Sequence, residues 1–292
     1  MIVVPGPASK ELGIKIGTLL GARVVHVEFK HFPDGESYVR YIDDINWEDV
    51  VIVQTTSPPQ DTRLVQLLLL IDAAKDLGAR SVTAIVPYFA YSRQDKRFRP
   101  GEAISLRTMI KLIEAAGADR FVTVDVHNPD ALRYFKIPTA NLSAMSLLAE
   151  YAKECGLEGA FSLAPDEHAL PRAKIVESVL NGGCDWLPKE RDSITGKITV
   201  VEKTFDVQGK DAVVVDDIIS TGGTMIAATS ILKKQNARRV AVMCAHALLM
   251  GGAKEKIIEA GADMVVGTDS VSSDVTTVSV APIVADYLRK GF

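Results

Sequence analysis

Short runs of valine and isoleucine alternate with longer stretches of helical periodicity along the chain. The apolar runs predict buried strands, and apolar residues three and four positions apart predict helices. Such strands between helices are typical of mainly parallel sheets that helices cover on both faces. The expected strands are Ile2–Val4, Arg23–Phe29, Val50–Gln54, Val82–Pro87, Phe121–Val126, Gly159–Ala164, Ile198–Glu202, Ala212–Asp216, Val240–Ala245 and Met264–Thr268. The expected helices are Ser9–Leu20, Thr62–Leu77, Ile104–Ala116, Ser143–Glu154, His168–Leu180, Gly223–Gln235, Gly252–Ala260 and Pro282–Arg289.

The two halves of the chain resemble each other. Three short matches carry the similarity: Asp49–Gln54 with Asp211–Asp216, Ala79–Val82 with Ala237–Val240, and Ala115–Asp119 with Glu259–Asp263, at offsets of 162, 158 and 144 residues. We infer two copies of one α/β unit, joined near Ile137–Asn141. The expected domains are 1–140 and 141–280, with a C-terminal helix at 281–292 that completes the first domain.

The first copy carries an insertion. The offset falls from 158 to 144 residues after Ala79–Val82, so the first copy holds 14 extra residues, which we place in a loop at 88–101. This loop is rich in arginine, lysine and aromatic residues. A loop after a strand's carboxyl end is a candidate lid, in which Arg93 and Arg97 clamp phosphates and Lys96 adds a point charge. The alternative is a solvated surface loop.

Composition limits the possible functions. The chain has 292 residues, of which 47% are hydrophobic and 24% charged, with a formal net charge of -4. There is no global basic field for nucleic acid and no apolar run of the ~20 residues that a membrane span needs. The first residues show no export signal, so we expect a cytoplasmic protein. Its scattered cysteines, Cys155, Cys184 and Cys244, are expected to be reduced, buried and small apolar residues.

The most informative stretch is Val213–Thr224, which reads V-V-V-D-D-I-I-S-T-G-G-T. A buried strand, Ala212–Val215, runs into two carboxylates, and a turn of small residues leads into an expected helix. Such a junction presents main-chain N–H groups to a phosphate, and glycines let the main chain approach it closely. The spacing is neither that of a P-loop nor that of a dinucleotide fingerprint. The residues expected to bind are Asp216, Asp217, Ser220, Thr221, Gly222, Gly223 and Thr224.

The paired carboxylates limit which ligands could bind here. Beside a phosphate site they need a partner with hydroxyl groups, and a sugar diol can donate to both. Ribose 5-phosphate fits this pattern, whereas an ordinary capped loop is the alternative. Gln54 and Thr55 occupy the positions of Asp216 and Asp217 in the first copy, so we expect this site only in the second half.

This stretch resembles the ribose-phosphate loop of the type I phosphoribosyltransferase fold. The resemblance implies two tandem domains of that fold, each a mainly parallel sheet flanked by helices. Three kinds of protein remain open: a phosphoribosyltransferase, the pyrophosphokinase that makes its substrate, and a non-catalytic protein that senses the ligand.

Four further segments carry candidate chemistry. In His31–Glu36, Phe32 could stack on a purine while Asp34 and Glu36 accept hydrogen bonds, although Pro-Asp-Gly alone indicates a turn. Asp125 and His127 are two apart on an expected strand, so they point to the same side. His127 could ligate a divalent ion or meet a phosphate, or be structural.

The other two segments lie in the second half. Asp166 is expected to open a helix as its N-cap, or to bind Mg²⁺ directly or through water. Lys189 and Arg191 alternate on an extended segment and so point the same way, which suits a transferring phosphoryl group. A solvated face is the alternative for this pair.

Together these segments resemble the ribose-phosphate pyrophosphokinase family in order along nearly the whole chain. The matching motifs are Phe32–Glu36, Tyr91–Asp95, Asp125–His127, Pro165–Asp166, Lys189–Arg191 and Asp216–Thr224. One departure is Asn128–Arg133, which lacks the glutamine-rich run that many members have. This departure leaves subunit contacts and regulatory sites open.

The resemblance implies transfer of the β,γ-diphosphoryl group of ATP to O1 of ribose 5-phosphate, with release of AMP, for nucleotide biosynthesis. It implies a self-associating protein with no nucleic-acid or membrane partner. The implied ATP site contains Arg93, Gln94, Asp95 and His127, with Phe32, Asp34, Gly35 and Glu36 supplied by a neighbouring subunit. The implied Mg²⁺ ligands are His127 and Asp166. Lys189 and Arg191 would stabilise the transferring group, and Arg191 would also contact ribose 5-phosphate.

Overall fold

The computed structural model describes residues 1–191, 198–200 and 203–291. The chain divides into two compact units, Met1–Ser143 with Ser279–Phe292, and Ala144–Val278. These limits lie within three residues of the expected domain boundaries. None of the described helices is long and apolar enough to span a lipid bilayer.

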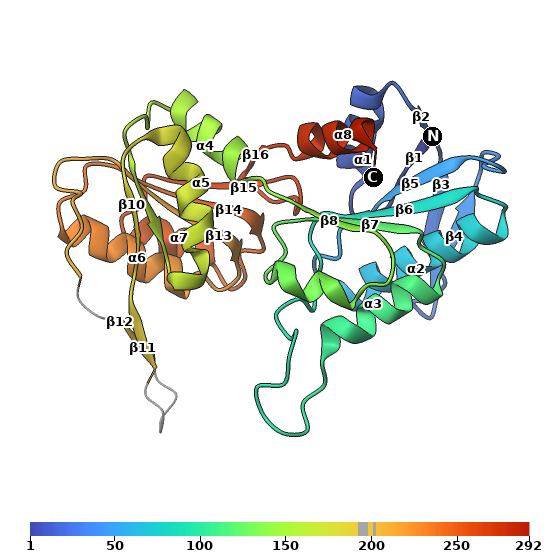
Figure 1. The fold of residues 1–292 in the computed structure, drawn as a ribbon, viewed down its shortest axis with the longest axis horizontal. Helices are drawn as coiled ribbons and strands as arrows, with labels where there is room; N and C mark the ends of the chain where they lie inside the picture. The colour runs from blue at the N-terminus through green and yellow to red at the C-terminus, as the bar shows by residue number, and fades with distance from the viewer. Residues whose placement is uncertain (192–197, 201–202, 292) are drawn as a thin grey trace. The chain divides into compact units, whose positions relative to one another are not determined.

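The first unit is a six-stranded parallel sheet in the order β2-β1-β5-β6-β7-β8. Its strands are β1 (Ile2–Pro5), β2 (Arg23–Val24), β5 (Asp49–Val53), β6 (Ser81–Val86), β7 (Arg120–Val124) and β8 (Thr139–Leu142). Helices α1 and α8 lie on one face of the sheet, and α2 and α3 lie on the other (Figure 1). These helices are α1 (Lys10–Leu20), α2 (Gln60–Asp76), α3 (Ser105–Ala115) and α8 (Ala281–Lys290), and a 3₁₀ helix, η1 (Pro129–Tyr134), precedes β8.

The second unit repeats this plan, with strand order β10-β9-β13-β14-β15-β16. Its strands are β9 (Phe161–Ala164), β10 (Cys184–Trp186), β13 (Ala212–Ile219), β14 (Val240–Ala247), β15 (Met264–Thr268) and β16 (Thr276–Val278). Its helices are α4 (Met145–Glu154), α5 (Leu170–Leu180), α6 (Gly223–Lys234), α7 (Ala253–Glu259) and the 3₁₀ helix η2 (Glu167–Ala169). A small antiparallel pair joins β11 (Lys189–Arg191) to β12 (Ile198–Val200). The matching strand orders agree with the repeat inferred from the sequence.

The repeat extends to side chains at the amino ends of the strands. Asp119 accepts hydrogen bonds from the main-chain N–H of Val82 at 2.7 Å and from Lys75 Nζ at 3.1 Å. The equivalent aspartate, Asp263, accepts from the corresponding N–H and lysine at 2.8 and 3.0 Å. Each aspartate therefore ties a helix to the start of a central strand in its own unit.

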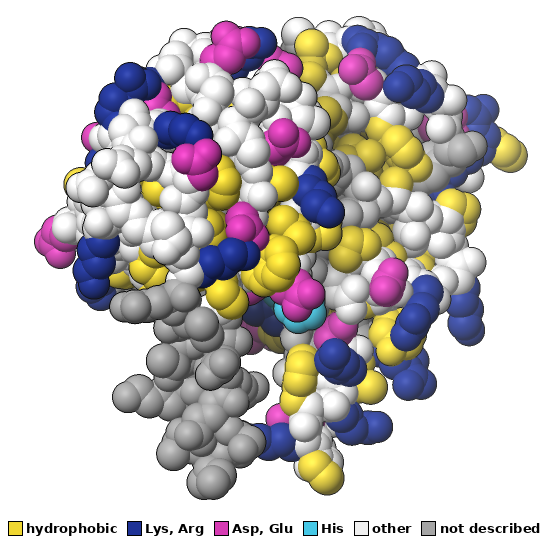
Figure 2. All heavy atoms as spheres, turned by 60° about the vertical axis from the view of Figure 1, so that its left-hand side comes forward, with side chains coloured by type: hydrophobic (Ala, Val, Ile, Leu, Met, Phe, Trp, Pro, Cys, Tyr) yellow, Lys and Arg dark blue, Asp and Glu magenta, His cyan; other side chains and the backbone are white. Residues whose placement is uncertain are grey.

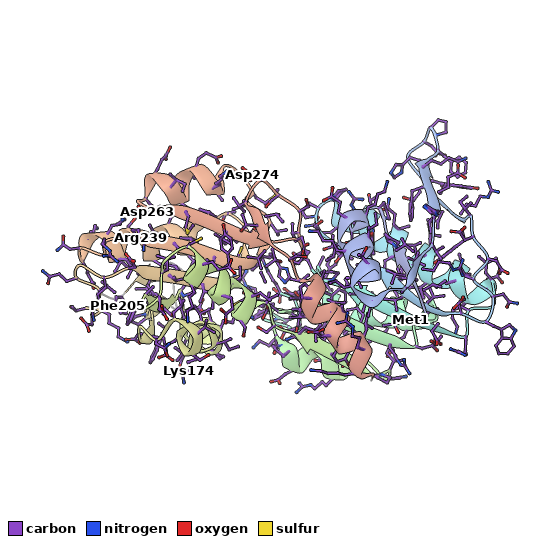
Figure 3. The ribbon with its side chains drawn as sticks, turned by 90° about the horizontal axis from the view of Figure 1, so that it is seen from above. Met1, Lys174, Phe205, Arg239, Asp263 and Asp274 are labelled. Carbon is purple, nitrogen blue, oxygen red and sulfur yellow. The ribbon has the colours of Figure 1, made fainter. Side chains whose placement is uncertain are left out.

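A second pair of aspartates marks the same edge. Asp49 accepts from Arg80 Nε at 2.9 Å. Its counterpart Asp211 is almost fully buried and accepts from Arg238 Nη2 at 2.7 Å and from Arg239 Nη2 at 2.6 Å. Figure 3 shows Arg239 close to Asp263 at this edge. The arginines lower the pKa of both aspartates, to about 2 for Asp49.

Several sequence expectations were wrong in detail. The strand expected at Arg23–Phe29 is broken after β2, where His26 N–H bonds Asp43 Oδ2 at 2.8 Å, and β3 (Val27–His31) then pairs with β4 (Ser37–Tyr41). Strands β4, β8, β10 and β16 were not expected, because they are short or carry many polar residues. Only Cys244 is buried, whereas Cys155 and Cys184 are partly exposed.

Candidate active site

The turn after β13 has the geometry of an anion site. Gly222 is the N-cap of α6 and has a φ of 77°, a left-handed conformation that glycine adopts without strain. No side chain caps this helix among the described residues. The first-turn N–H groups of a helix lack intrahelical acceptors, so they are available to an anion. A Cβ built on Gly223 would meet no atom within 4 Å, so the main chain there is open to a ligand.

The turn is held from behind by α7. A Cβ at Gly222 would lie 3.1 Å from Ala253 Cβ and 3.3 Å from Ile257 Cδ1, so only glycine fits this close approach without a shift. The main-chain N–H of Met250 also donates to Ser220 O at 2.9 Å. These contacts fix the turn before any ligand arrives, which limits the entropy lost on binding.

The two carboxylates lie within β13, which continues to Ile219, and not after the strand as the sequence suggested. Successive strand residues face opposite sides of a sheet, so the two carboxylates have different surroundings. The side chain of Asp217 is only 4% exposed and lies 3.5 Å from Arg172 of α5. Asp216 is half-buried and its Oδ1 accepts from the N–H of Asp217 at 2.8 Å.

The environment of Asp216 disfavours its charge. Burial raises the pKa of Asp216 well above its usual range, and the carboxylate of Asp217 raises it further. The N–H of Asp217 and the guanidinium of Arg172 oppose this shift without cancelling it. A donor such as a sugar hydroxyl would relieve this carboxylate, so Asp216 is suited to a ligand that offers hydroxyl groups.

Asp166 and β11 lie near the same edge of this sheet. Strand β9 ends two residues before Asp166 and pairs with β13, so both strands deliver acidic residues to one edge. Asp166 Oδ1 accepts from the N–H of Ala169 at 3.1 Å, which confirms the expected N-cap. Lys189 and Arg191 lie on β11, which follows β10 and is extended as expected. The side chains of Lys189 and Arg191 are outside the described part of the chain.

In the first unit, the candidate ATP residues follow β6 and β7. Tyr88, Phe89 and Ala90 are buried, so the first three residues of the expected lid belong to the core. Arg93 is exposed. Figure 2 shows dark-blue lysine and arginine side chains over the projecting loop at the lower end of the view.

The expected geometry of His127 was wrong. Strand β7 ends at Val124, and Asp125 has a φ of 37°, which turns the chain out of the sheet. Asp125 is therefore buried and accepts from Ser143 Oγ at 3.0 Å, whereas His127 is exposed. The two side chains have different surroundings and do not form a shared strand face.

Asn128 links the lid to the segment that carries His127. Its Nδ2 donates to Asp95 Oδ2 at 2.5 Å, and its Oδ1 accepts from the N–H of Asp130 at 3.1 Å. Asp95 is only 8% exposed. Asn128 stands in the segment that departs from the family pattern, and here it fixes the base of the lid beside His127.

The β3–β4 hairpin presents Phe32–Glu36 at its tip. Phe32 is 45% exposed and its ring lies edge-on to Tyr38, with centroids 5.8 Å apart. Asp34 and Glu36 are exposed, and Gly35 has a φ of 97° that shapes the turn. The hairpin and the lid lie on different sides of the unit (Figure 1). The structure thus brings Arg93–Asp95 near His127 in one chain but leaves the hairpin tip apart from them.

Residues 1–117 match the N-terminal domain of ribose phosphate pyrophosphokinase, and residues 131–281 match the phosphoribosyl transferase domain. The chain is 43% identical over 288 residues to the ribose-phosphate pyrophosphokinase of Methanothermobacter thermautotrophicus, covering 99% of this chain and 100% of that protein. This chain belongs to the ribose-phosphate pyrophosphokinase family. A relative of the same name from Saccharolobus solfataricus is 40% identical over 289 residues, covering 98% of this chain and 99% of its own.

The fold agrees with membership of this family. The crystal structure of phosphoribosylpyrophosphate synthetase from Mycobacterium smegmatis superposes with a TM-score of 0.87 at 30% identity, covering 99% of this chain and 97% of that one. The expected architecture of two phosphoribosyltransferase-like domains is therefore confirmed.

No group of three or more histidine, cysteine or acidic side chains that could hold a metal ion occurs among the described residues. Mg²⁺ does not require such a group, because it usually keeps several waters and takes one or two protein ligands together with substrate phosphates. The carboxylate of Asp166 is an oxygen ligand of this kind in the second unit, and His127 is exposed in the first unit.

The sequence did not single out Arg172 as a site residue. Arginine at this position has no local signal, because its importance comes from Asp217, which is 45 residues away in the sequence. Glu102, just beyond the expected lid, was also missed. Its position directly after Pro100-Gly101 could have identified it, since that dipeptide predicts a turn that brings the next residue back to the lid.

Proposed function

We propose that this protein is a ribose-phosphate diphosphokinase. It transfers the β,γ-diphosphoryl group of ATP to O1 of ribose 5-phosphate and releases AMP. The observation that carries this proposal is the half-buried carboxylate of Asp216 followed by the open helix N-terminus at Gly222. This arrangement offers acceptors for sugar hydroxyls and donors for the 5-phosphate on one rigid strand–turn–helix unit.

In this mechanism, Asp216 accepts hydrogen bonds from ribose hydroxyls, and Asp217 is held beside Arg172 away from solvent. Main-chain N–H groups and hydroxyls of the turn bind the 5-phosphate through Ser220, Thr221, Gly222, Gly223 and Thr224. The ligand then presents O1 for in-line attack on the β-phosphorus. The bond from the β-phosphorus to the oxygen that bridges it to the α-phosphorus breaks, AMP leaves with that oxygen, and the proton of the O1 hydroxyl passes to water.

ATP binds to residues of the first unit. Arg93 and Gln94 bind its phosphates. Asp95 fixes the base of the lid through its hydrogen bond with Asn128, which is next to His127 in the chain. When bound, Mg²⁺ would neutralise phosphate oxygens, with His127 and Asp166 as its protein ligands. Lys189 and Arg191 stabilise charge on the transferring group, and Arg191 also contacts the sugar phosphate.

We further propose that the protein self-associates. Phe32, Asp34, Gly35 and Glu36 complete the ATP site of a neighbouring subunit. The exposure of the hairpin tip, and its place on a different side of the unit from the lid, support this assignment. The free cysteines support a cytoplasmic location.

Phosphorus NMR of the protein mixed with ATP, Mg²⁺ and ribose 5-phosphate tests the reaction. We expect a new diphosphate on the anomeric carbon and an equimolar amount of AMP. Lys189→Ala should lower kcat by roughly 10²-fold or more while ribose 5-phosphate still binds, as for a contact made in the transition state. Release of pyrophosphate from added 5-phosphoribosyl 1-diphosphate and a nucleobase, without ATP, would instead identify a phosphoribosyltransferase. Near-normal turnover by Lys189→Ala would overturn the assigned role.

A further inference from the structure

The lid folds back on a carboxylate. Glu102 Oε2 accepts three hydrogen bonds: from the main-chain N–H of Phe98 at 2.8 Å, from that of Arg99 at 3.0 Å, and from Gln94 Nε2 at 3.1 Å. The main-chain carbonyl of Glu102 also accepts from Arg97 Nε at 2.9 Å. Three donors that converge on one oxygen define a specific anion site, and not a general positive surface.

The local sequence builds this site. Arg99-Pro100-Gly101-Glu102 forms a turn in which the N–H of Glu102 donates to Arg99 O at 3.3 Å, with Gly101 at a φ of 86°. Proline at the second position and glycine with positive φ at the third are typical of a type II turn. The turn returns Glu102 over the consecutive N–H groups of Phe98 and Arg99, an arrangement that binds anions in many proteins.

These donors favour the charged form of the Glu102 carboxylate. The N–H groups of Arg99 and Phe98 hold the pKa of Glu102 below its usual range. Gln94 Nε2 also donates to Lys96 O at 3.1 Å, so both of its N–H donors are used within the loop. Gln94 Nε2 can therefore donate to a ligand only if it gives up one of these two hydrogen bonds.

We propose that the N–H groups of Phe98 and Arg99, together with Gln94 Nε2, form a phosphate-binding site of the lid, and that Glu102 competes for it. This inference rests on the proposed function, because that function makes the incoming anion a nucleotide phosphate. A phosphate carries more charge than a carboxylate and offers several acceptor oxygens, so it displaces Glu102 and frees Gln94.

Glu102→Ala and Glu102→Gln test the competition. We expect KM for ATP to fall roughly 3- to 10-fold in Glu102→Ala and less in Glu102→Gln, since the glutamine keeps an acceptor but loses the charge. KM for ribose 5-phosphate should stay unchanged. Glu154→Ala removes one exposed negative charge from the second unit and should change neither value.

Hydrogen exchange at the amides of Phe98 and Arg99 gives a readout that does not require turnover. These amides should exchange faster in Glu102→Ala than in the wild-type protein, and inorganic triphosphate should slow them in both. An unchanged or raised KM for ATP, or amides that triphosphate leaves unprotected, would overturn the proposal and make Glu102 a structural support of the lid. Absence of AMP formation by the wild-type protein would instead overturn the proposed function, and the triphosphate experiment would still decide whether the lid binds phosphate.

Discussion

The same position in the two repeats is built in opposite ways. At the carboxyl end of β5, Gln54 is completely buried, its Oε1 accepts from the N–H of Ala8 at 3.0 Å, and its Nε2 donates to Arg63 O at 3.3 Å. At the equivalent position within β13, Asp216 is half-buried with a raised pKa. In the first unit the amide of Gln54 is satisfied by internal hydrogen bonds, whereas in the second unit Asp216 is a carboxylate that a ligand's donors could satisfy.

The N-termini of the helices that follow these two strands differ in how many free main-chain donors they offer. Helix α2 has Pro59 as its N-cap, and proline has no N–H to offer. Helix α6 has Gly222 as its N-cap and open space beside Gly223. At the proposed site, the common scaffold therefore has exposed donors and one poorly compensated carboxylate in place of internal hydrogen bonds, at a cost in stability.

The largest expected effect comes from making the first unit resemble the second. Gln54→Glu would bury a carboxylate whose second oxygen faces acceptors in place of the Nε2 donor. We expect the free energy of unfolding at about pH 8 to fall by roughly 3 kcal/mol, and less near pH 5, where the acid can protonate and donate. Chemical denaturation at the two pH values measures this difference. Gln60→Glu, at the start of α2, is the control and should cost little, because a helix N-terminus favours negative charge.

An unchanged stability in Gln54→Glu would mean that water reaches this edge of the first sheet. The two units would then differ in sequence at this position but not in how well they shield it from water. The contrast between Gln54 and Asp216 would then not hold.

The reverse exchange should give a smaller effect of opposite sign. A raised pKa in the folded protein means that Asp216 contributes most stability below its unfolded pKa of ~3.9 and loses that contribution as pH rises through its folded pKa. Asp216→Asn should therefore be more stable than the wild-type protein by about 1–2 kcal/mol near pH 8, with a smaller gain near pH 5. Denaturation at both pH values measures the gain.

The same variant tests function. Asp216→Asn should raise KM for ribose 5-phosphate by roughly 10²-fold, since an amide accepts hydroxyl hydrogen bonds less well than a carboxylate. A variant that is stabilised but binds the sugar normally would show that the charge is not used for binding.

Sequence periodicity could predict the sheets and their helices, because these depend on local apolar patterns, and the three matched segments could predict the repeat. The local sequence could also predict the turn at Gly222–Gly223, since glycine readily adopts the positive φ that such a turn needs. It could not place Asp217, whose burial depends on Arg172 in a distant helix. It also could not predict that Asp125 leaves the strand, because that bend is held by Ser143 from another segment.

The smallest expected effect tests the part that the repeats share. Asp119→Asn and Asp263→Asn keep an oxygen for the strand N–H but lose the charge that pairs with Lys75 or Lys233. Both aspartates are more than two-fifths exposed, so each change should cost less than about 1 kcal/mol, with the two costs equal within roughly 0.5 kcal/mol. Thermal unfolding of both variants at neutral pH measures the costs.

The pH dependence of the stability loss should show whether it comes from the charge of the aspartate. Burial opposes ionisation of Asp263, but the N–H of Val240 and the ammonium of Lys233 outweigh it and lower its pKa. A lowered folded pKa gives stability that is present above the unfolded pKa and is lost as pH falls through the folded value. The difference between Asp263→Asn and the wild-type protein should therefore shrink below about pH 4. A large cost in only one unit would show that the repeats share strand order without sharing how their edges are held.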